Sequence, residues 1–368
     1  MKKNWQQYFP FEKPREQQQI AIEAGIDALR EKKFFVLQAG TGVGKSAIGL
    51  TIAKFINNEL SSDEEYSSGA NFLTTQKVLQ KQYIKDFSSN GMVSIESSAN
   101  FSCRHHKQNT CAQSMRVLKT ATRGSRFWNT CVFKCPYKNA KREFIDSEIG
   151  ITNFPYFLAE TNYARKILPK NVLVVDEAHN AADELGKFIE IAITEKFSKD
   201  FLKISMPEVS THKKAIDWIN QVYFPKLVQK FKHMEKTLDN LNLSSKLSEF
   251  ESLARQFELI DKHLCKLRRF LEVHSRDNWT FTNVEAFGKK SRRIEFKPID
   301  VAPFSDNMLF SYGRKVVLMS ATILDKEKFC KMLGIPLEEC EFISIESPFE
   351  NKKRPILYFP VGKMGLFP

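Results

Sequence analysis

The chain has 368 residues, of which 42% are hydrophobic and 12% aromatic, and its formal net charge is +13. This composition excludes a disordered chain, because it provides enough apolar side chains for packed cores, and the length predicts two or three domains. No apolar run approaches the ~18 residues that cross a bilayer, so we expect no membrane partner.

The opening MKKNWQQYFPFEKPREQQQ has no continuous apolar segment of the kind found in a secretory signal. Seven cysteines, an odd number, also argue against a disulfide framework. We therefore expect an intracellular protein in a reducing compartment.

The first predicted unit is a strand, a glycine-rich turn and a helix. An apolar run at Phe34–Leu37 leads into Ala39-Gly40-Thr41-Gly42-Val43-Gly44-Lys45-Ser46, a P-loop with alanine in place of the usual first glycine. In such a loop the backbone N–H groups surround phosphate oxygens at the positive end of the helix dipole. Lys45 would reach the β- and γ-phosphates of ATP, and Ser46 would bind Mg²⁺.

Residues 103–142 contain four of the seven cysteines and ten Lys or Arg, but no Asp or Glu. The pattern predicts a lobe held by a metal and placed against a polyanion, and basic residues interleaved with rings suit single-stranded nucleic acid. The aromatic side chains Phe127, Trp128, Phe133 and Tyr137 would either stack on bases or form the lobe's core. The basic residues are Arg104, Lys107, Arg116, Lys119, Arg123, Arg126, Lys134, Lys138, Lys141 and Arg142.

A second buried strand is predicted at Val172–Val175, followed by Asp176 and Glu177. Asp176 would hold Mg²⁺ through water, and Glu177 would polarise the water that attacks the γ-phosphate. Acidic residues also favour ordinary helix starts. Their occurrence beside a P-loop favours the nucleotide site.

The region from 186 to 294 is predicted to be mostly helical, because apolar residues such as Leu227, Phe231 and Met234 recur at three- and four-residue spacing. We assign packing, not chemistry, to these faces. The strand-like RRIEFKPIDVAP is expected to return the chain to the nucleotide-binding domain before Ser320.

Taken together, the motifs resemble those of superfamily 2 helicases. Asp176-Glu177-Ala178-His179 is similar to the DEAH box, which places His179 beside the catalytic residues Lys45, Asp176 and Glu177. Ser320-Ala321-Thr322 resembles the SAT motif that couples hydrolysis to strand movement. FLTTQKVLQKQY resembles the motif that grips the nucleic-acid backbone, with Thr74, Thr75 and Gln76 as contacts. KPREQQQ resembles the adenine-reading motif, with Arg15 and Gln18 as contacts and Gln17 as a register alternative.

Four cysteines inserted between the P-loop and the DEAH-like box resemble the iron–sulfur domain of the XPD and DinG helicases, which unwind DNA in the 5′-to-3′ direction. The resemblance implies one [4Fe–4S] cluster on Cys103, Cys111, Cys131 and Cys135. Zinc is the competing metal. Only Cys131 and Cys135 have the close spacing common in zinc sites, with His105 and His106 as further ligands.

The implied fold class is α/β, a RecA-like parallel-sheet domain with a small iron–sulfur domain and a mostly helical arch domain inserted. Its parts would be residues 1–98, 144–185 and 295–345 for the RecA-like domain, 99–143 for the iron–sulfur domain, 186–294 for the arch, and 346–368 for the start of a second motor domain. We expect a monomeric fragment that binds ATP and single-stranded DNA. The second motor lobe, which would be supplied in cis or in trans, is expected to be missing. The chain should therefore hydrolyse ATP weakly and should not unwind DNA alone.

Two other functions remain open from the sequence: a DEAH-box RNA helicase or zinc-containing P-loop ATPase, and a non-catalytic nucleic-acid-binding module. The expected location is the cytoplasm, associated with the nucleoid, or the nucleus in a eukaryote.

Overall fold

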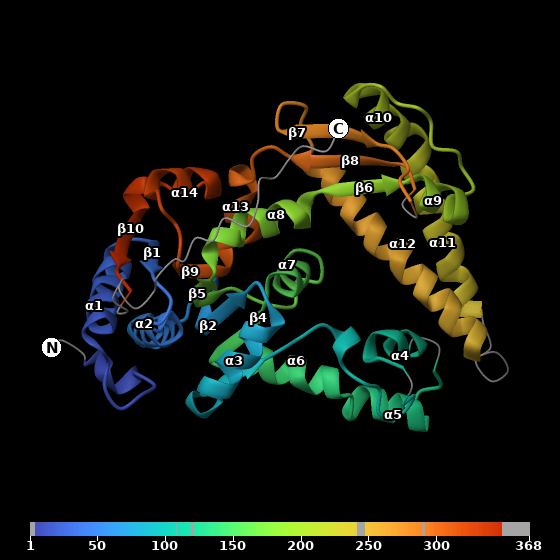
Figure 1. The fold of residues 1–368 in the computed structure, drawn as a ribbon. Coiled ribbons are helices and arrows are strands. Elements are labelled where there is room, and N and C mark those ends of the chain that lie inside the picture. The colour runs from blue at the N-terminus through green and yellow to red at the C-terminus, as the bar shows by residue number, and fades with distance from the viewer. Residues whose placement is uncertain (1–3, 108, 119–120, 241–246, 289–290, 348–368) are drawn as a thin grey trace, which may run out of the picture.

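The computed structural model describes residues 4–107, 109–118, 121–240, 247–288 and 291–347. Its largest unit is a seven-stranded, fully parallel sheet with the strand order β10-β1-β9-β5-β2-β4-β3 (Figure 1). This confirms the expected α/β class. The strands are β1 (Phe34–Ala39), β2 (Ser67–Thr74), β3 (Met92–Ser94), β4 (Ile149–Asn153), β5 (Lys170–Asp176), β9 (Gly313–Ser320) and β10 (Cys340–Ile345).

Helices cover both faces of this sheet. Along β1, Phe35 and Leu37 pack into the core shared with α1, α2 and α3, whereas Phe34 and Val36 pack into the core shared with α7, α8, α13 and α14. A sheet buried on both faces needs apolar side chains on both, which explains the continuous apolar runs in the sequence. No helix in the described ranges is long and apolar enough to span a membrane. The covering helices are α1 (Glu16–Glu31), α2 (Lys45–Glu59), α3 (Lys77–Phe87), α7 (Phe154–Asn162), α8 (Ala181–Ile189), α13 (Ala302–Met308) and α14 (Lys326–Leu333).

The cysteine-rich segment forms a separate helical lobe between β3 and β4 (Figure 1). Its last helix continues to Asp146 and leads into β4, so the lobe is joined to the sheet by a helix that crosses the boundary expected at residue 143. The lobe helices are α4 (Cys111–Val117), α5 (Arg126–Phe133) and α6 (Pro136–Asp146).

The region after α8 combines helices with a small antiparallel sheet of order β6-β8-β7. The long helices there agree with the predicted helical pattern. The strand-like stretch at Arg293–Pro298 was expected to return to the large sheet, but it forms β8 and pairs with β6 and β7. The reason is that an alternating pattern indicates a strand without indicating which strand it pairs with. These elements are β6 (Ile191–Thr194), α9 (Glu195–Phe197), α10 (His212–Trp218), α11 (Phe224–Asn240), α12 (Leu247–Val273), β7 (Trp279–Val284) and β8 (Arg293–Pro298).

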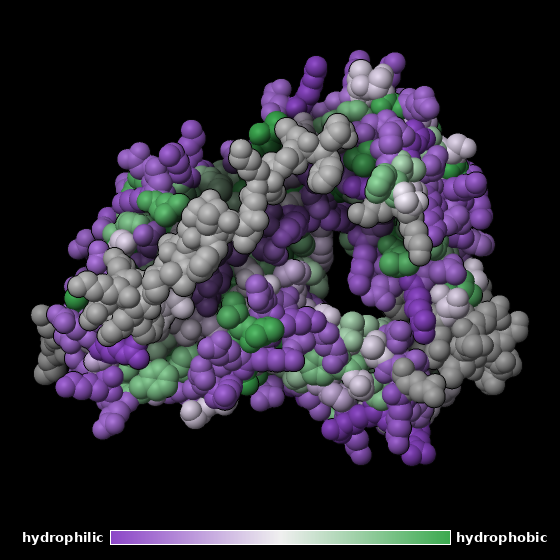
Figure 2. Space-filling model, viewed as in Figure 1, coloured by the Kyte–Doolittle hydropathy of each residue, from purple (hydrophilic) through white to green (hydrophobic). Residues whose placement is uncertain are grey.

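The lobe and the helical region meet at their far ends. Phe127 and Cys131 of the lobe form a buried cluster with Leu238 of α11, and Phe257 of α12 packs against it. Figure 2 shows an opening through the molecule, bounded by the sheet domain, the lobe and this helical region. The fold therefore encloses a passage with the cysteine lobe on its rim.

Candidate nucleotide site and cysteine lobe

The P-loop joins the end of β1 to the start of α2. Gly42 and Gly44 have φ values of 89° and 90°, a left-handed conformation that glycine adopts without steric cost. A Cβ at residue 44 would also collide with the Gln18 side chain. The Lys45 ammonium donates to the carbonyl of Ala39 at 3.3 Å, which places it over the loop. The turn thus presents backbone N–H groups and one cation to the same space.

The amino-terminal motif packs directly on this loop. Arg15 Nη1 donates to the carbonyl of Gly42 at 2.8 Å, and Gln18 Nε2 donates to the carbonyl of Val43 at 2.9 Å. Arg15 and Gln18 line the cavity in front of the P-loop, while Gln17 is not among the residues that line it. The geometry favours Gln18 over the register alternative.

Strand β5 ends at the two acidic residues. Asp176 is 5% exposed and accepts two hydrogen bonds, from the Tyr83 hydroxyl to Oδ2 at 2.9 Å and from the Glu177 backbone N–H to Oδ1 at 3.0 Å. Burial raises the pKa of Asp176, and the Tyr83 hydrogen bond opposes that rise. Glu177 has a φ of 52°, an unusual conformation for a residue with a side chain and one that occurs preferentially at functional sites.

His179 connects the DEAH-like box to the SAT-like segment. Its Nδ1 atom lies 2.7 Å from Ser320 Oγ and 3.4 Å from Glu177 Oε2. Ser320 is fully buried at the end of β9, and its hydroxyl also accepts from the Thr322 backbone N–H at 3.2 Å. A displacement of residues 320–322, which include Ala321, would therefore reach Glu177 through one imidazole.

One cavity gathers most of the predicted nucleotide-binding residues. Gly40, Val43 and His179 lie outside its lining. The sequence did not predict six lining residues, namely Phe9, Phe11, Lys13, Leu79, Gln82 and Tyr83. The position of Phe9 and Phe11 just before the KPREQQQ motif was a signal that could have identified these two. The predicted residues that line it are Arg15, Gln18, Thr41, Gly42, Gly44, Lys45, Ser46, Asp176 and Glu177.

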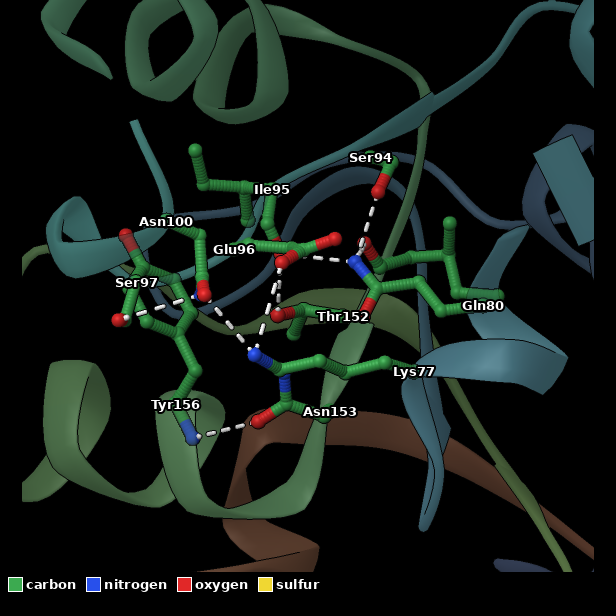
Figure 3. Close-up of polar contacts among 11 residues, drawn as sticks. Lys77, Gln80, Ser94, Ile95, Glu96, Ser97, Asn100, Thr152, Asn153 and Tyr156 are labelled. Carbon is green, nitrogen blue, oxygen red and sulfur yellow. Dashed lines mark hydrogen bonds and ion pairs between the residues drawn. The ribbon is translucent and has the colours of Figure 1, made fainter. Parts of the chain in front are cut away.

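The predicted nucleic-acid motif lies at the carboxyl ends of β2, β3 and β4, where α3 begins (Figure 3). Thr74 is fully buried and its hydroxyl donates to the Gln76 carbonyl at 3.3 Å, so it does not offer an exposed contact; Thr75 is half-buried and Gln76 is exposed. Lys77, which was not predicted, is exposed and donates to Asn100 Oδ1 at 2.9 Å.

Gln80 fixes the orientation of α3 against the neighbouring strands. It is 1% exposed, and its amide nitrogen donates to Ser94 Oγ at 2.7 Å and to the Ile95 carbonyl at 2.9 Å. Thr152 of β4 donates to that same carbonyl at 2.8 Å (Figure 3). The edge that carries Gln76 and Lys77 is therefore held by buried hydrogen bonds.

The four lobe cysteines come together around one small cavity. Each is buried, and the Sγ atoms of Cys111 and Cys135 lie 3.6 Å apart. Within the described ranges no group of three or more His, Cys, Asp or Glu is arranged to hold a single metal ion. Thiolates on one tetrahedral ion lie closer together than thiolates that hold a four-iron cluster, so the separation of Cys111 and Cys135 is nearer to the spacing of single-ion ligands. Four buried thiols around a shared cavity match a cluster in the number and type of donors.

Burial raises the pKa of the Cys111 thiol to about 12, and burial also raises the pKa of Cys131. Both groups are thiols at neutral pH and would lose a proton on binding a metal. His105 lines the same cavity, and His106 and His105 contact the Phe127 ring. A histidine that could serve as a zinc ligand therefore lines the same cavity as the four cysteines.

Most of the predicted basic residues of the lobe are accessible. Lys141 differs, because it forms an ion pair with Glu160 of α7 and is only 17% exposed. Phe127 is buried in the lobe's own cluster and Tyr137 in the large core that also contains Tyr156 of α7, whereas Phe133 is 65% exposed. Lys119 lies outside the described residues, and the side chain of Arg116 is not described. The exposed basic residues of the lobe are Arg104, Lys107, Arg123, Arg126, Lys134 and Arg142, and Lys138 is half-buried.

Comparisons with known proteins agree with this architecture. No curated protein matches the chain. The solved structure "XPD_Helicase" is similar with a TM-score of 0.56 and 15% identity, over 91% of this chain and 63% of that one. "Truncated XPD" has a TM-score of 0.53 and 15% identity, over 89% of this chain and 99% of that one. At this identity the likeness shows a shared fold.

A family model, "Type III restriction enzyme, res subunit", matches residues 11–206. The matched span contains the P-loop, the cysteine lobe and the DEAH-like box. The chain therefore belongs to this family, ResIII, and carries a helicase-type motor domain of superfamily 2.

Proposed function

We propose that the chain is the ATP-driven motor portion of an iron–sulfur DNA helicase of the XPD and DinG type, which moves 5′ to 3′ along single-stranded DNA. The observation that carries the proposal is the single cavity in which the side chains of Lys45, Ser46, Asp176 and Glu177 meet. These residues lie at and beyond the carboxyl ends of β1 and β5 of one parallel sheet, the edge at which α/β folds bind ligands.

The roles of the residues follow from their positions. The P-loop N–H groups and Lys45 bind the phosphates, while Arg15 and Gln18 flank the loop where the adenine would lie. Ser46 and the buried Asp176 would hold Mg²⁺, which when bound neutralises charge on the β- and γ-phosphates. Glu177 accepts a proton from the attacking water. His179 links Glu177 to Ser320, so nucleotide binding at the site can change the position of the end of β9.

Single-stranded DNA is the proposed polymer. The opening in Figure 2 is bounded by the lobe, whose exposed residues include several Arg and Lys, and Gln76 and Lys77 are exposed at the edge of the sheet. Exposed cations on the lobe suit a phosphate backbone, and the exposed Phe133 ring offers a stacking surface.

The lobe cysteines are proposed to hold a [4Fe–4S] cluster. Bound there, the cluster would supply covalent links among the loop of Cys103, the first residue of α4, the middle of α5 and the residue before α6. The lobe's own apolar core is small, so such links would set the positions of its basic residues. A zinc site remains the alternative. Iron content and a preference for DNA over RNA separate the proposal from the RNA-helicase and zinc-ATPase alternatives.

Charge removal on the lobe tests the DNA assignment. In a chain with both Arg126→Ala and Arg142→Ala, the slope of log affinity for single-stranded DNA against log salt concentration should decrease by about 1.4, because each lost phosphate contact removes ~0.7. Fluorescence anisotropy with a labelled oligonucleotide at several salt concentrations gives the slope.

The matched control is a double variant on α14, Lys328→Ala with Lys331→Ala, which removes two exposed lysines from the sheet domain. Its slope should equal that of the wild type. Equal slopes for the lobe variant and the wild type would contradict the DNA assignment, and would favour a motor whose lobe does not touch nucleic acid.

A further inference from the structure

The buried end of α3 reaches the proposed metal site through one side chain. Tyr83 is 2% exposed, and its hydroxyl donates to Asp176 Oδ2 at 2.9 Å. The other carboxylate oxygen accepts the Glu177 backbone N–H at 3.0 Å. Each oxygen therefore has one protein donor and keeps lone pairs free for water or metal, because a carboxylate accepts about four hydrogen bonds in total.

The direction of the Tyr83 hydroxyl is set by packing. Its ring lies between Phe72 of β2 and Phe87 of α3, with centroid distances of 6.0 Å and 5.7 Å. Phe11, which lines the nucleotide cavity, contacts Phe87 at 6.1 Å. A ring enclosed on these sides cannot swing its hydroxyl away from Asp176 without disturbing the core.

Ser46 lines the same cavity as Tyr83 and Asp176. The Tyr83 hydroxyl thus contacts one of the two side chains that we propose as magnesium ligands, and the other lines the same cavity. Ser46 comes from the P-loop helix and Asp176 from β5, so neither element alone determines the distance between these two groups. Tyr83 of α3 contacts the Asp176 side of this pair from a third element.

We infer that Tyr83 is a positioning residue that holds Asp176 in the arrangement that binds Mg²⁺ with the nucleotide. The inference rests on the proposed function and adds a residue that no helicase motif in the sequence singles out for this role. Since α3 begins at Lys77, beside the polar edge in Figure 3, one helix spans the proposed nucleic-acid contact and the metal site.

Tyr83→Phe tests the inference, because it removes the hydroxyl and keeps the ring. In the 368-residue chain saturated with a non-hydrolysable ATP analogue, Mn²⁺ in place of Mg²⁺ is titrated and free Mn²⁺ is followed by electron paramagnetic resonance. We expect about tenfold weaker Mn²⁺ binding, the lower end of the effect of losing an outer-shell partner of a metal ligand. Affinity for the analogue without divalent metal should be unchanged.

Two further variants make the result decisive. Tyr312→Phe also loses one tyrosine hydrogen bond, to the Thr161 carbonyl at 3.1 Å, in the same domain but away from the cavity, and should bind Mn²⁺ as the wild type does. Asp176→Asn removes the proposed ligand itself and gives the full size of the effect.

If Asp176→Asn loses Mn²⁺ while Tyr83→Phe binds it as tightly as the wild type, the inference is overturned and the proposed function stands. It is also overturned if Tyr83→Phe loses the analogue in the absence of metal, because the hydroxyl would then support the fold of the site. If the wild type binds no analogue, or Asp176→Asn changes nothing, the proposed function itself fails.

Discussion

Replacement of Glu177 by Gln is expected to slow ATP hydrolysis about 100-fold or more, because the amide cannot take the proton of the attacking water. Nucleotide affinity should change little, since Gln keeps the shape of the side chain and the phosphates are bound by the P-loop. Single-turnover phosphate release, measured with single-stranded DNA present, gives the rate, and binding of a labelled analogue gives the affinity.

Glu184→Gln is the matched control for this experiment. Glu184 lies in the first turn of α8, a short distance along the chain, and pairs with Lys187 at 3.0 Å and not with the cavity. It should hydrolyse ATP at the wild-type rate. Unaltered hydrolysis by Glu177→Gln would exclude the motor assignment and support a module in which nucleotide only regulates binding.

Cys135→Ser should abolish the bound iron and the brown colour of protein purified without air. Cys135 is 4% exposed, lies beside Cys111 and immediately precedes α6. Its loss would therefore remove one of the four proposed ligands and the proposed link to the helix that enters the sheet domain. Because the cysteine lobe has a small apolar core, we also expect faster proteolysis between residues 99 and 143 and weaker binding of single-stranded DNA.

Cys265→Ser provides the comparison, because Cys265 is a half-buried thiol on α12 that lies outside the cysteine cavity. It should retain iron, colour and DNA affinity. The nucleotide cavity is lined by other elements, so both variants should bind the ATP analogue normally. Full iron content in Cys135→Ser would contradict the proposed ligand set.

The sequence predicted the elements whose signal is local. The P-loop combines a strand, a turn with two glycines at positive φ and a helix start within a short segment, so its geometry is encoded in neighbouring residues. Likewise Asp176 ends a strand that is buried along its whole length. The shared nucleotide cavity follows from these two signals, whereas the parallel sheet was implied by the resemblance to superfamily 2 helicases.

Features that depend on distant partners were not predictable in this way. Tyr83 contacts Asp176 only because β2 lies beside β5, and Lys141 is neutralised by Glu160 only because α6 packs near α7. Thr74 is buried although its motif suggested an exposed contact, since it is the last residue of a central strand. The strands that pair with β8 could not be predicted either, because an alternating sequence does not specify which strand lies next to it.

The central claim is that one chain combines a nucleotide-driven motor with a DNA-binding lobe held by four thiolates. Iron, sulfide and zinc analysis of the wild-type chain purified without air, with the affinity of the same sample for single-stranded DNA, tests it most directly. The account predicts about four irons per chain, as one [4Fe–4S] cluster requires, a visible absorption band and tight DNA binding. Colourless, iron-free protein that binds single-stranded DNA with undiminished affinity would contradict it.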